Sequence, residues 1–135
     1  MKRFNVRVYG IYLEGNQLLV CEEMIRGQKI LKFPGGGLEF GEGTLDCLKR
    51  EFMEEMQLEI EVLSHFYTTD YFQPSAYDDS QVISIYYRVR PANSITLPLR
   101  NEREYFFMAE LDEDLLAAIT LPIDHIVAAK LLHGI

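Results

Sequence analysis

The chain has few cysteines, no long apolar run and fewer basic than acidic residues, and each of these shortages argues against a class of protein. Its two cysteines, Cys21 and Cys47, are too few for a disulfide framework. No apolar run approaches the roughly 20 residues that a membrane-spanning helix needs. The residues after Met1 also lack the unbroken apolar segment of a signal peptide. We therefore expect a reduced, soluble, cytoplasmic protein without a membrane partner.

Basic residues are scarce, with 13 Lys and Arg against 21 Asp and Glu and a net charge of −8. No run of Lys or Arg is present, and binding to a nucleic-acid backbone depends on clustered positive charge. We expect no binding to a DNA or RNA backbone. A bound divalent cation would offset part of the acidity.

The chain lacks internal repeats, low-complexity tracts and linker-like stretches, so its 135 residues are expected to form one domain over residues 1–135. Thr44 is predicted to cap a helix that runs on from residue 44, and two closing helices are expected at 112–119 and 122–132. Alternating apolar and β-branched residues predict strands over residues 6–13, 18–24, 30–33, 60–71, 81–89 and 104–108. The first two of these strands should pair around a turn at 14–16. The pattern therefore predicts a mixed α and β fold.

The helix that starts near residue 44 carries most of the functional information. Glu51, Glu54 and Glu55 stand at positions i, i+3 and i+4, so their carboxylates converge on one face. Like charges at this spacing repel each other, and hard divalent cations bind oxygen ligands. We therefore interpret the cluster as a metal site rather than an exposed acidic face. A separate face, expected to pack on the sheet, carries Leu45, Leu48, Phe52 and Met56.

The surrounding pattern resembles the Nudix box, the signature of the Nudix hydrolase family. It reads Gly36, five residues, Glu42, seven residues, and then Arg50-Glu51-Phe52-Met53-Glu54-Glu55-Met56-Gln57-Leu58. The probability that six fixed identities occur at this spacing by chance in a chain of this size is on the order of 10⁻⁵. The glycine-rich entry Phe33-Pro34-Gly35-Gly36-Gly37 is also similar to that of the family. The resemblance implies an α/β/α sandwich with a mixed β-sheet.

Gln57 departs from the family pattern, which places a glycine there. That glycine normally ends the helix in a left-handed conformation, and a residue with a Cβ pays roughly 1–2 kcal/mol to adopt it. Two outcomes remain open: either Gln57 tolerates the strain or the last turn closes differently. Neither outcome moves the three glutamates off their shared face.

The resemblance also implies a set of site residues. Glu51, Glu54 and Glu55 would hold Mg²⁺ or Mn²⁺ together with a backbone carbonyl of Gly35 or Gly36. Such an ion lowers the pKa of a bound water and stabilises charge on phosphoryl oxygens, which suits water attack on a diphosphate.

Four further residues are predicted to assist. Arg50 would orient a carboxylate by a forked hydrogen bond, and Glu42 would support the helix or an outer metal ion. The general base is either a box glutamate or a later acid, for which Glu102 and Glu104 are candidates. Substrate-binding residues are not assigned by any motif.

The resulting hypothesis is an enzyme that hydrolyses a pyrophosphate bond in a nucleoside diphosphate linked to another moiety. One alternative is hydrolysis of a non-nucleotide diphosphate, and another is a sensor that binds a nucleotide without turnover. The acidic triad argues against the sensor, because a pure binder has little reason to keep carboxylates that repel each other. A homodimer is a further expectation, because such dimers are common in general and in this family.

Overall fold

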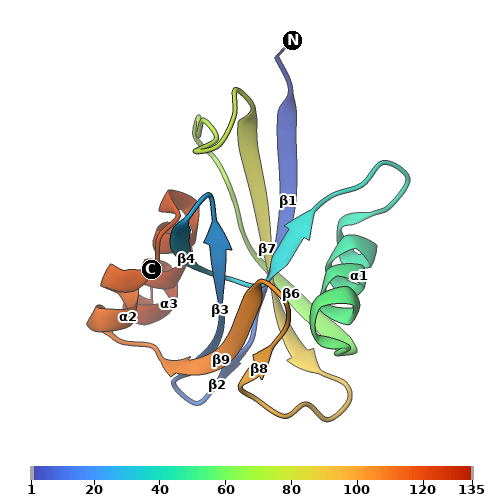
Figure 1. Ribbon diagram of the computed structural model, residues 1–135, viewed down its shortest axis with the longest axis vertical. Coiled ribbons are helices and arrows are strands. Elements are labelled where there is room, and N and C mark those ends of the chain that lie inside the picture. Colours follow the sequence, from blue (N-terminus) through green and yellow to red (C-terminus); the bar gives the residue numbers. More distant parts are fainter. Residues whose placement is uncertain (1, 135) are drawn as a thin grey trace. The chain divides into compact units, whose positions relative to one another are not determined.

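The computed structural model of the protein describes residues 2–134, and the chain divides into two compact units (Figure 1). The first contains the residues up to Gly10 together with Gly35–Asn93, and the second contains Ile11–Pro34 and the residues from Ser94 onward. The described helices are all short, and among residues 2–134 none is long and apolar enough to cross a membrane.

The first unit is built on a four-stranded sheet in the order β5-β1-β7-β6. Its strands are β1 (Phe4–Ile11), β5 (Gly35–Gly37), β6 (Ile60–Thr68) and β7 (Gln81–Pro91). β5 pairs antiparallel with β1, and β6 pairs antiparallel with β7. β1 and β7 run in the same direction in Figure 1, and at the start of both the Gln81 N–H donates to the Arg3 carbonyl at 3.0 Å. The sheet is therefore mixed, as expected.

Helix α1 (Thr44–Met56) packs on this unit through four buried side chains, Cys47, Leu48, Phe52 and Met56. Three of them were predicted from helical spacing, but Leu45 is 43% exposed and does not belong to the packed face. The predicted N-cap is also one residue late. Gly43 caps the helix without a side-chain bond, and the Thr44 hydroxyl instead lies 2.8 Å from the hydroxyl of Tyr87.

The end of α1 settles the question raised by Gln57. This residue has φ 52° and ψ 37°, the left-handed conformation that the family reserves for glycine. Its N–H donates to Met53 O at 2.9 Å, and the N–H of Leu58 donates to Phe52 O at 3.4 Å. These bonds satisfy carbonyls that a helix end leaves open, and Leu58 is buried just beyond. Gln57 therefore tolerates the strain.

The second unit holds an antiparallel sheet in the order β2-β3-β9-β8, with β4 also paired to β3. Its strands are β2 (Leu13–Glu14), β3 (Gln17–Ile25), β4 (Gln28–Lys32), β8 (Leu99–Arg100) and β9 (Glu104–Glu110). The predicted pairing around the turn at 14–16 is present but short, with Leu13 opposite Leu18 and Glu14 opposite Gln17. Only β2 takes part in this hairpin. The earlier part of the predicted segment forms β1, which pairs in the other sheet.

Two helices complete the second unit, α2 (Glu113–Ala118) and α3 (Pro122–His133), as predicted from their periodicity. Asp112 caps α2 by accepting the Leu115 N–H at 2.8 Å. Asp124, in the first turn of α3, is 1% exposed and accepts the Phe33 N–H at 3.1 Å. This bond fixes α3 to the residue that follows β4.

Candidate metal and catalytic site

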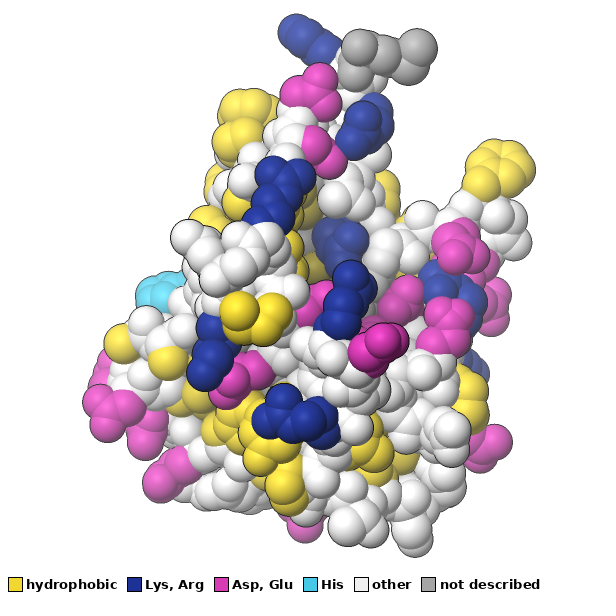
Figure 2. Space-filling model, viewed as in Figure 1, with side chains coloured by type: hydrophobic (Ala, Val, Ile, Leu, Met, Phe, Trp, Pro, Cys, Tyr) yellow, Lys and Arg dark blue, Asp and Glu magenta, His cyan; other side chains and the backbone are white. Residues whose placement is uncertain are grey.

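Arg50 is the centre of the predicted site. Its Nε donates to Glu42 Oε2 at 3.0 Å and its Nη2 to Glu42 Oε1 at 2.7 Å, which is a bidentate pair. Its Nη1 donates to Glu51 Oε1 at 3.0 Å and to Glu54 Oε1 at 3.1 Å. The guanidinium thus contacts three of the predicted acidic residues at once. Figure 2 shows acidic side chains gathered around a basic one over the loop and helix that follow β5.

The pairing of Arg50 with Glu42 keeps both groups charged. The hydrogen bonds from Arg50 lower the pKa of Glu42 to about 2, and the Glu39 N–H adds a further bond to Glu42 Oε1 at 3.0 Å. In return, the Glu42 carboxylate raises the pKa of Arg50 above its usual range. Glu42 therefore acts here as the anchor of Arg50 rather than as a titrating acid.

Positions 35 and 36 require glycine, because neighbouring atoms lie too close to the backbone to leave room for a Cβ. A Cβ built on Gly36 would lie 2.4–2.6 Å from the carboxylate atoms of Glu51, so a side chain there would displace that carboxylate. Gly35 has φ 148°, and a Cβ there would lie 2.1 Å from the Val8 carbonyl oxygen. The glycine strand β5 is thus a cradle into which helix α1 places the Glu51 carboxylate.

The two glycine carbonyls predicted as ligands face different directions. The Leu38 N–H donates to Val6 O at 2.9 Å, and two residues along, Gly36 is opposite Val8. Antiparallel pairs alternate between bonded and non-bonded, so the Gly36 carbonyl points toward β1 and those of Gly35 and Gly37 point away from β1. The Gly37 carbonyl accepts Arg50 Nη2 at 3.1 Å.

The three box glutamates lie along one side of α1 but do not yet converge on one point. Glu51 and Glu54 both turn toward Arg50, and the Glu54 side chain is 57% exposed. Glu55 is half-buried, and its Oε2 atom is buried. Within residues 2–134, no three His, Cys, Asp or Glu side chains are placed as they stand to hold a metal ion together. The donor set of carboxylates beside a glycine carbonyl nevertheless fits a hard divalent cation.

Cys47 contributes to the same region as a packing and hydrogen-bonding group. Its thiol is buried and lies 3.5 Å from the Gly37 carbonyl oxygen. Burial, reinforced by the nearby Glu42 carboxylate, raises the pKa of the thiol to about 12. The thiol therefore stays protonated and unreactive.

The later acids considered as general bases belong to the second unit. Glu104 opens β9, accepts the Cys21 thiol at 3.5 Å and the Asn101 side-chain amide at 3.4 Å. Glu102 lies exposed in the turn before it. The box belongs to the first unit, so both acids stay predictions as alternatives to a box glutamate.

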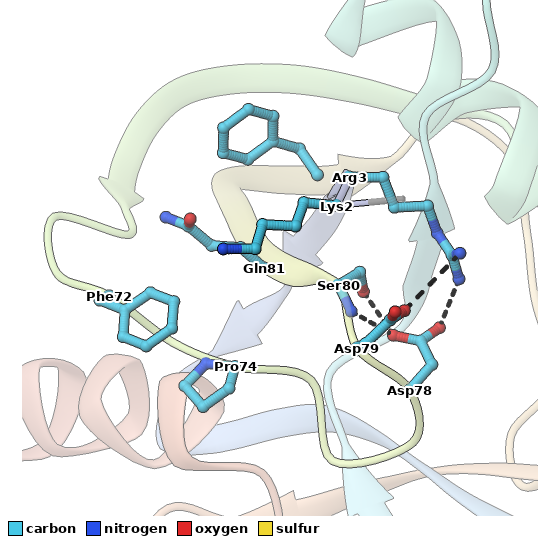
Figure 3. Close-up of a pocket in the computed structure, with 9 residues that line it drawn as sticks. Lys2, Arg3, Phe72, Pro74, Asp78, Asp79, Ser80 and Gln81 are labelled. Carbon is cyan, nitrogen blue, oxygen red and sulfur yellow. Dashed lines mark hydrogen bonds and ion pairs between the residues drawn. The ribbon is translucent and has the colours of Figure 1, made fainter.

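A separate hollow of about 390 Å³ lies in the first unit, away from the box residues (Figure 3). Arg3 Nη2 binds Asp78 there at 2.9 Å, and Asp78 accepts the hydroxyl and N–H of Ser80. These bonds, with those from Ser80 the largest, lower the pKa of Asp78 to about 2. Asp78 is therefore a structural carboxylate at this end of the sheet.

Sequence patterns did not single out Arg7, which lies opposite Gly37 in the pairing of β1 with β5. Its Nε donates to the Tyr9 hydroxyl at 2.6 Å, and its guanidinium carbon lies 5.7 Å from the centre of the Tyr9 ring. Only the strand register reveals this placement, because no spacing motif links residue 7 to the glycines.

Comparison with known proteins agrees with the fold and with the family resemblance. Three solved structures are similar: the ORF135 protein of E. coli (16% identity, 98% of this chain and 91% of that one, TM-score 0.79), a NUDIX hydrolase from Nitrosomonas europaea (20%, 98% and 90%, 0.79) and the MutT protein of Bacillus halodurans (18%, 96% and 82%, 0.73). A family model described as the NUDIX domain matches residues 1–129. The chain therefore belongs to the Nudix family and is a hydrolase that acts on phosphoanhydride bonds.

Proposed function

We propose that this protein is a Mg²⁺- or Mn²⁺-dependent pyrophosphohydrolase that cleaves a nucleoside diphosphate linked to another moiety. The observation that carries the proposal is the contact of Glu51 with the Gly36 backbone, held by Arg50. It brings a fixed carboxylate to a strand edge where a glycine carbonyl also faces outward. Residues 1–135 would act as a single domain in this role.

The chain offers four ligands for the ion: the carboxylates of Glu51, Glu54 and Glu55 and the outward carbonyl of Gly35. Gly35 is preferred over Gly36, because the Gly36 carbonyl points toward β1. Bound Mg²⁺ would supply a water of lowered pKa and would stabilise charge on the phosphoryl oxygens. The water would attack a phosphorus atom of the diphosphate and release the two products.

Arg50 would set the geometry of this donor set. Its bond to Glu51 fixes one carboxylate, while its bond to the more exposed Glu54 is easier to break. Exposed ion pairs at i and i+4 are worth only about 0.3–0.5 kcal/mol, so Glu54 can leave Arg50 to join an ion at little cost. Glu42 would keep the guanidinium in place while this happens.

The proton acceptor would be a box glutamate, with Glu102 and Glu104 as the alternatives. Glu55 is half-buried, whereas the Glu54 side chain is 57% exposed, so Glu55 is the better shielded of these two. Replacing each of these acids by its amide and comparing the pH dependence of kcat would identify the base.

The proposed partners are a small diphosphate and a second copy of the chain, with no nucleic-acid backbone and no membrane. Both cysteines are buried, and the proposed location is the reduced environment of the cytoplasm. A non-nucleotide diphosphate is the alternative substrate, and a nucleotide sensor without turnover is the alternative function.

The test is product analysis on a panel of nucleotide and non-nucleotide diphosphates, with and without Mg²⁺. Glu54→Gln removes a ligand charge without removing volume, so we expect most turnover to be lost. Glu59→Gln, at an exposed position beyond α1, is the matched control and should behave as wild type. Wild-type activity in Glu54→Gln would refute the metal assignment, and saturable binding without turnover would favour the sensor.

A further inference from the structure

We propose that Arg7 is a substrate-positioning residue that binds a phosphate group of the substrate beside the glycine strand β5. The inference rests on the proposed function, since it assumes a diphosphate bound at this strand. It assigns one part of the binding site that no motif in the sequence marks.

The first argument is position. Arg7 lies opposite Gly37 in a non-bonded antiparallel pair, the type in which facing side chains come closest. A Cβ built on Gly37 would lie 3.6 Å from Arg7 Nη1, so the guanidinium stands over the backbone of the strand. β5 is the edge strand of its sheet and consists of three glycines, of which Gly35 and Gly36 are buried and Gly37 is partly exposed.

The second argument concerns the two faces of β5. Successive residues of a strand point to opposite faces, so the Gly36 face receives Glu51 and the Gly37 face receives Arg7. The proposed metal ligands and the Arg7 guanidinium thus approach the same three residues from opposite sides. A diphosphate bound beside Gly37, the partly exposed residue of the strand, would place one phosphate at Arg7 and direct the other toward the proposed metal ligands.

The third argument is that Arg7 is held in place. Its Nε donates to the Tyr9 hydroxyl at 2.6 Å, and Tyr9 is itself fixed, being 3% exposed and stacked on the fully buried Tyr86 with ring centres 5.3 Å apart. The phenol therefore orients the planar guanidinium before any ligand arrives. Pre-orientation of this kind reduces the entropy lost on binding.

Charge also favours this role. Arg50, the other guanidinium at β5, is bound to the carboxylates of Glu42, Glu51 and Glu54. Arg7 is the guanidinium on the opposite face of β5, and its Nε donates to the Tyr9 hydroxyl. A planar guanidinium matches two oxygens of a phosphate, and it would offset the repulsion that the box glutamates exert on an anionic substrate.

The experiment compares the binding of methylenediphosphonate, a non-hydrolysable diphosphate, in the presence of Mg²⁺ by calorimetry. Arg7→Met keeps an unbranched apolar side chain and removes the guanidinium and its charge, so Kd should rise about tenfold or more, as for loss of a charge-assisted bond. Arg7→Lys should restore part of the affinity. Arg88→Met is the matched control, because Arg88 also stacks on a ring of this sheet, with its guanidinium carbon 4.9 Å from the centre of Phe66.

Kinetics on a cleaved substrate provide a second readout. Arg7→Met should raise KM about tenfold while kcat changes far less, the pattern for a group that binds substrate and transition state alike. If Arg7 only braced Tyr9, Arg7→Met would lower the melting temperature and Arg7→Lys would not rescue binding. That result would overturn the inference.

The remaining outcomes separate this inference from the proposed function. Equal affinity of Arg7→Met and wild type, or no binding of the diphosphonate by wild type, would overturn the role of Arg7. Full turnover by Glu54→Gln would instead refute the metal assignment and leave the binding comparison valid. Weaker binding by Arg7→Met, with normal folding and partial rescue by Arg7→Lys, would establish the role of Arg7.

Discussion

Arg50 and Glu42 form a two-point pair across the loop that joins β5 to α1, with N–O distances of 3.0 and 2.7 Å. The pair ties the end of this loop to the second turn of the helix. It also leaves Nη1 of Arg50 directed at Glu51 and Glu54. Glu42 thus acts on the proposed metal ligands through Arg50, which explains why the box needs an acid so far from the helical glutamates.

Glu42→Gln should lower activity by about ten- to a hundredfold, the usual cost of losing a group that orients metal ligands. The amide keeps one acceptor oxygen, so it can no longer accept hydrogen bonds from Arg50 Nε and Nη2 on two separate oxygens. We expect the apparent affinity for Mg²⁺ to fall, and stability near neutral pH to fall as well, because the two-point pair is lost. Titration of activity with Mg²⁺ measures the first effect; unchanged Mg²⁺ dependence would contradict the role given to Glu42.

The same pair predicts a pH dependence of stability. The folded-state pKa of Glu42 is about 2, below its ordinary value of 4.5. Between these values the unfolded state binds more protons, so stability rises with pH in this window. The contribution of Glu42 is complete above about pH 4.5 and disappears as the pH falls through 2. Urea midpoints of wild type and Glu42→Gln should therefore converge from pH 5 to pH 2; a constant gap would show that the pair is not the cause.

Gly36→Ala should abolish most turnover, because its methyl group would lie 2.4–2.6 Å from the carboxylate of Glu51 and push it away. Gly43→Ala is the control, since a Cβ there meets only Asp46 Oδ2, at an ordinary 3.7 Å. Both substitutions are small and lie within eight residues of each other. Assays of kcat and of Mg²⁺ affinity on the two variants should differ sharply, and equal activity would show that Glu51 is not held by this contact.

Much of the box could be predicted from the sequence because its logic is local. Helical spacing fixes the shared side of Glu51, Glu54 and Glu55 without reference to the rest of the fold. The alternatives for Gln57 were also defined locally, by the cost of a left-handed conformation. The structure shows that Gln57 adopts the left-handed conformation, and the two backbone hydrogen bonds at the helix end offset the cost of that conformation.

The features that sequence reasoning missed depend on pairing between distant strands. Residues 4–14 alternate as one extended segment, yet β1 joins one sheet and β2 the other. No local pattern distinguishes these strands, because both need the same alternation. The role of Arg7 arises in the same way, from its register opposite Gly37. A shift of one residue would turn Arg7 to the other face, so the sequence alone does not assign it.

Asp124→Ala should destabilise the second unit by about 1–3 kcal/mol, the cost of leaving a buried donor without its acceptor. Asp124 is 1% exposed, and its Oδ2 accepts the N–H of Phe33, which is itself fully buried. The bond joins the first turn of α3 to the chain just after β4, so its loss should also weaken the docking of α3. Asp124→Asn keeps the acceptor oxygen and should lose less. Urea denaturation of both variants measures the difference, and equal midpoints for the two would show that the hydrogen bond is not what holds the helix.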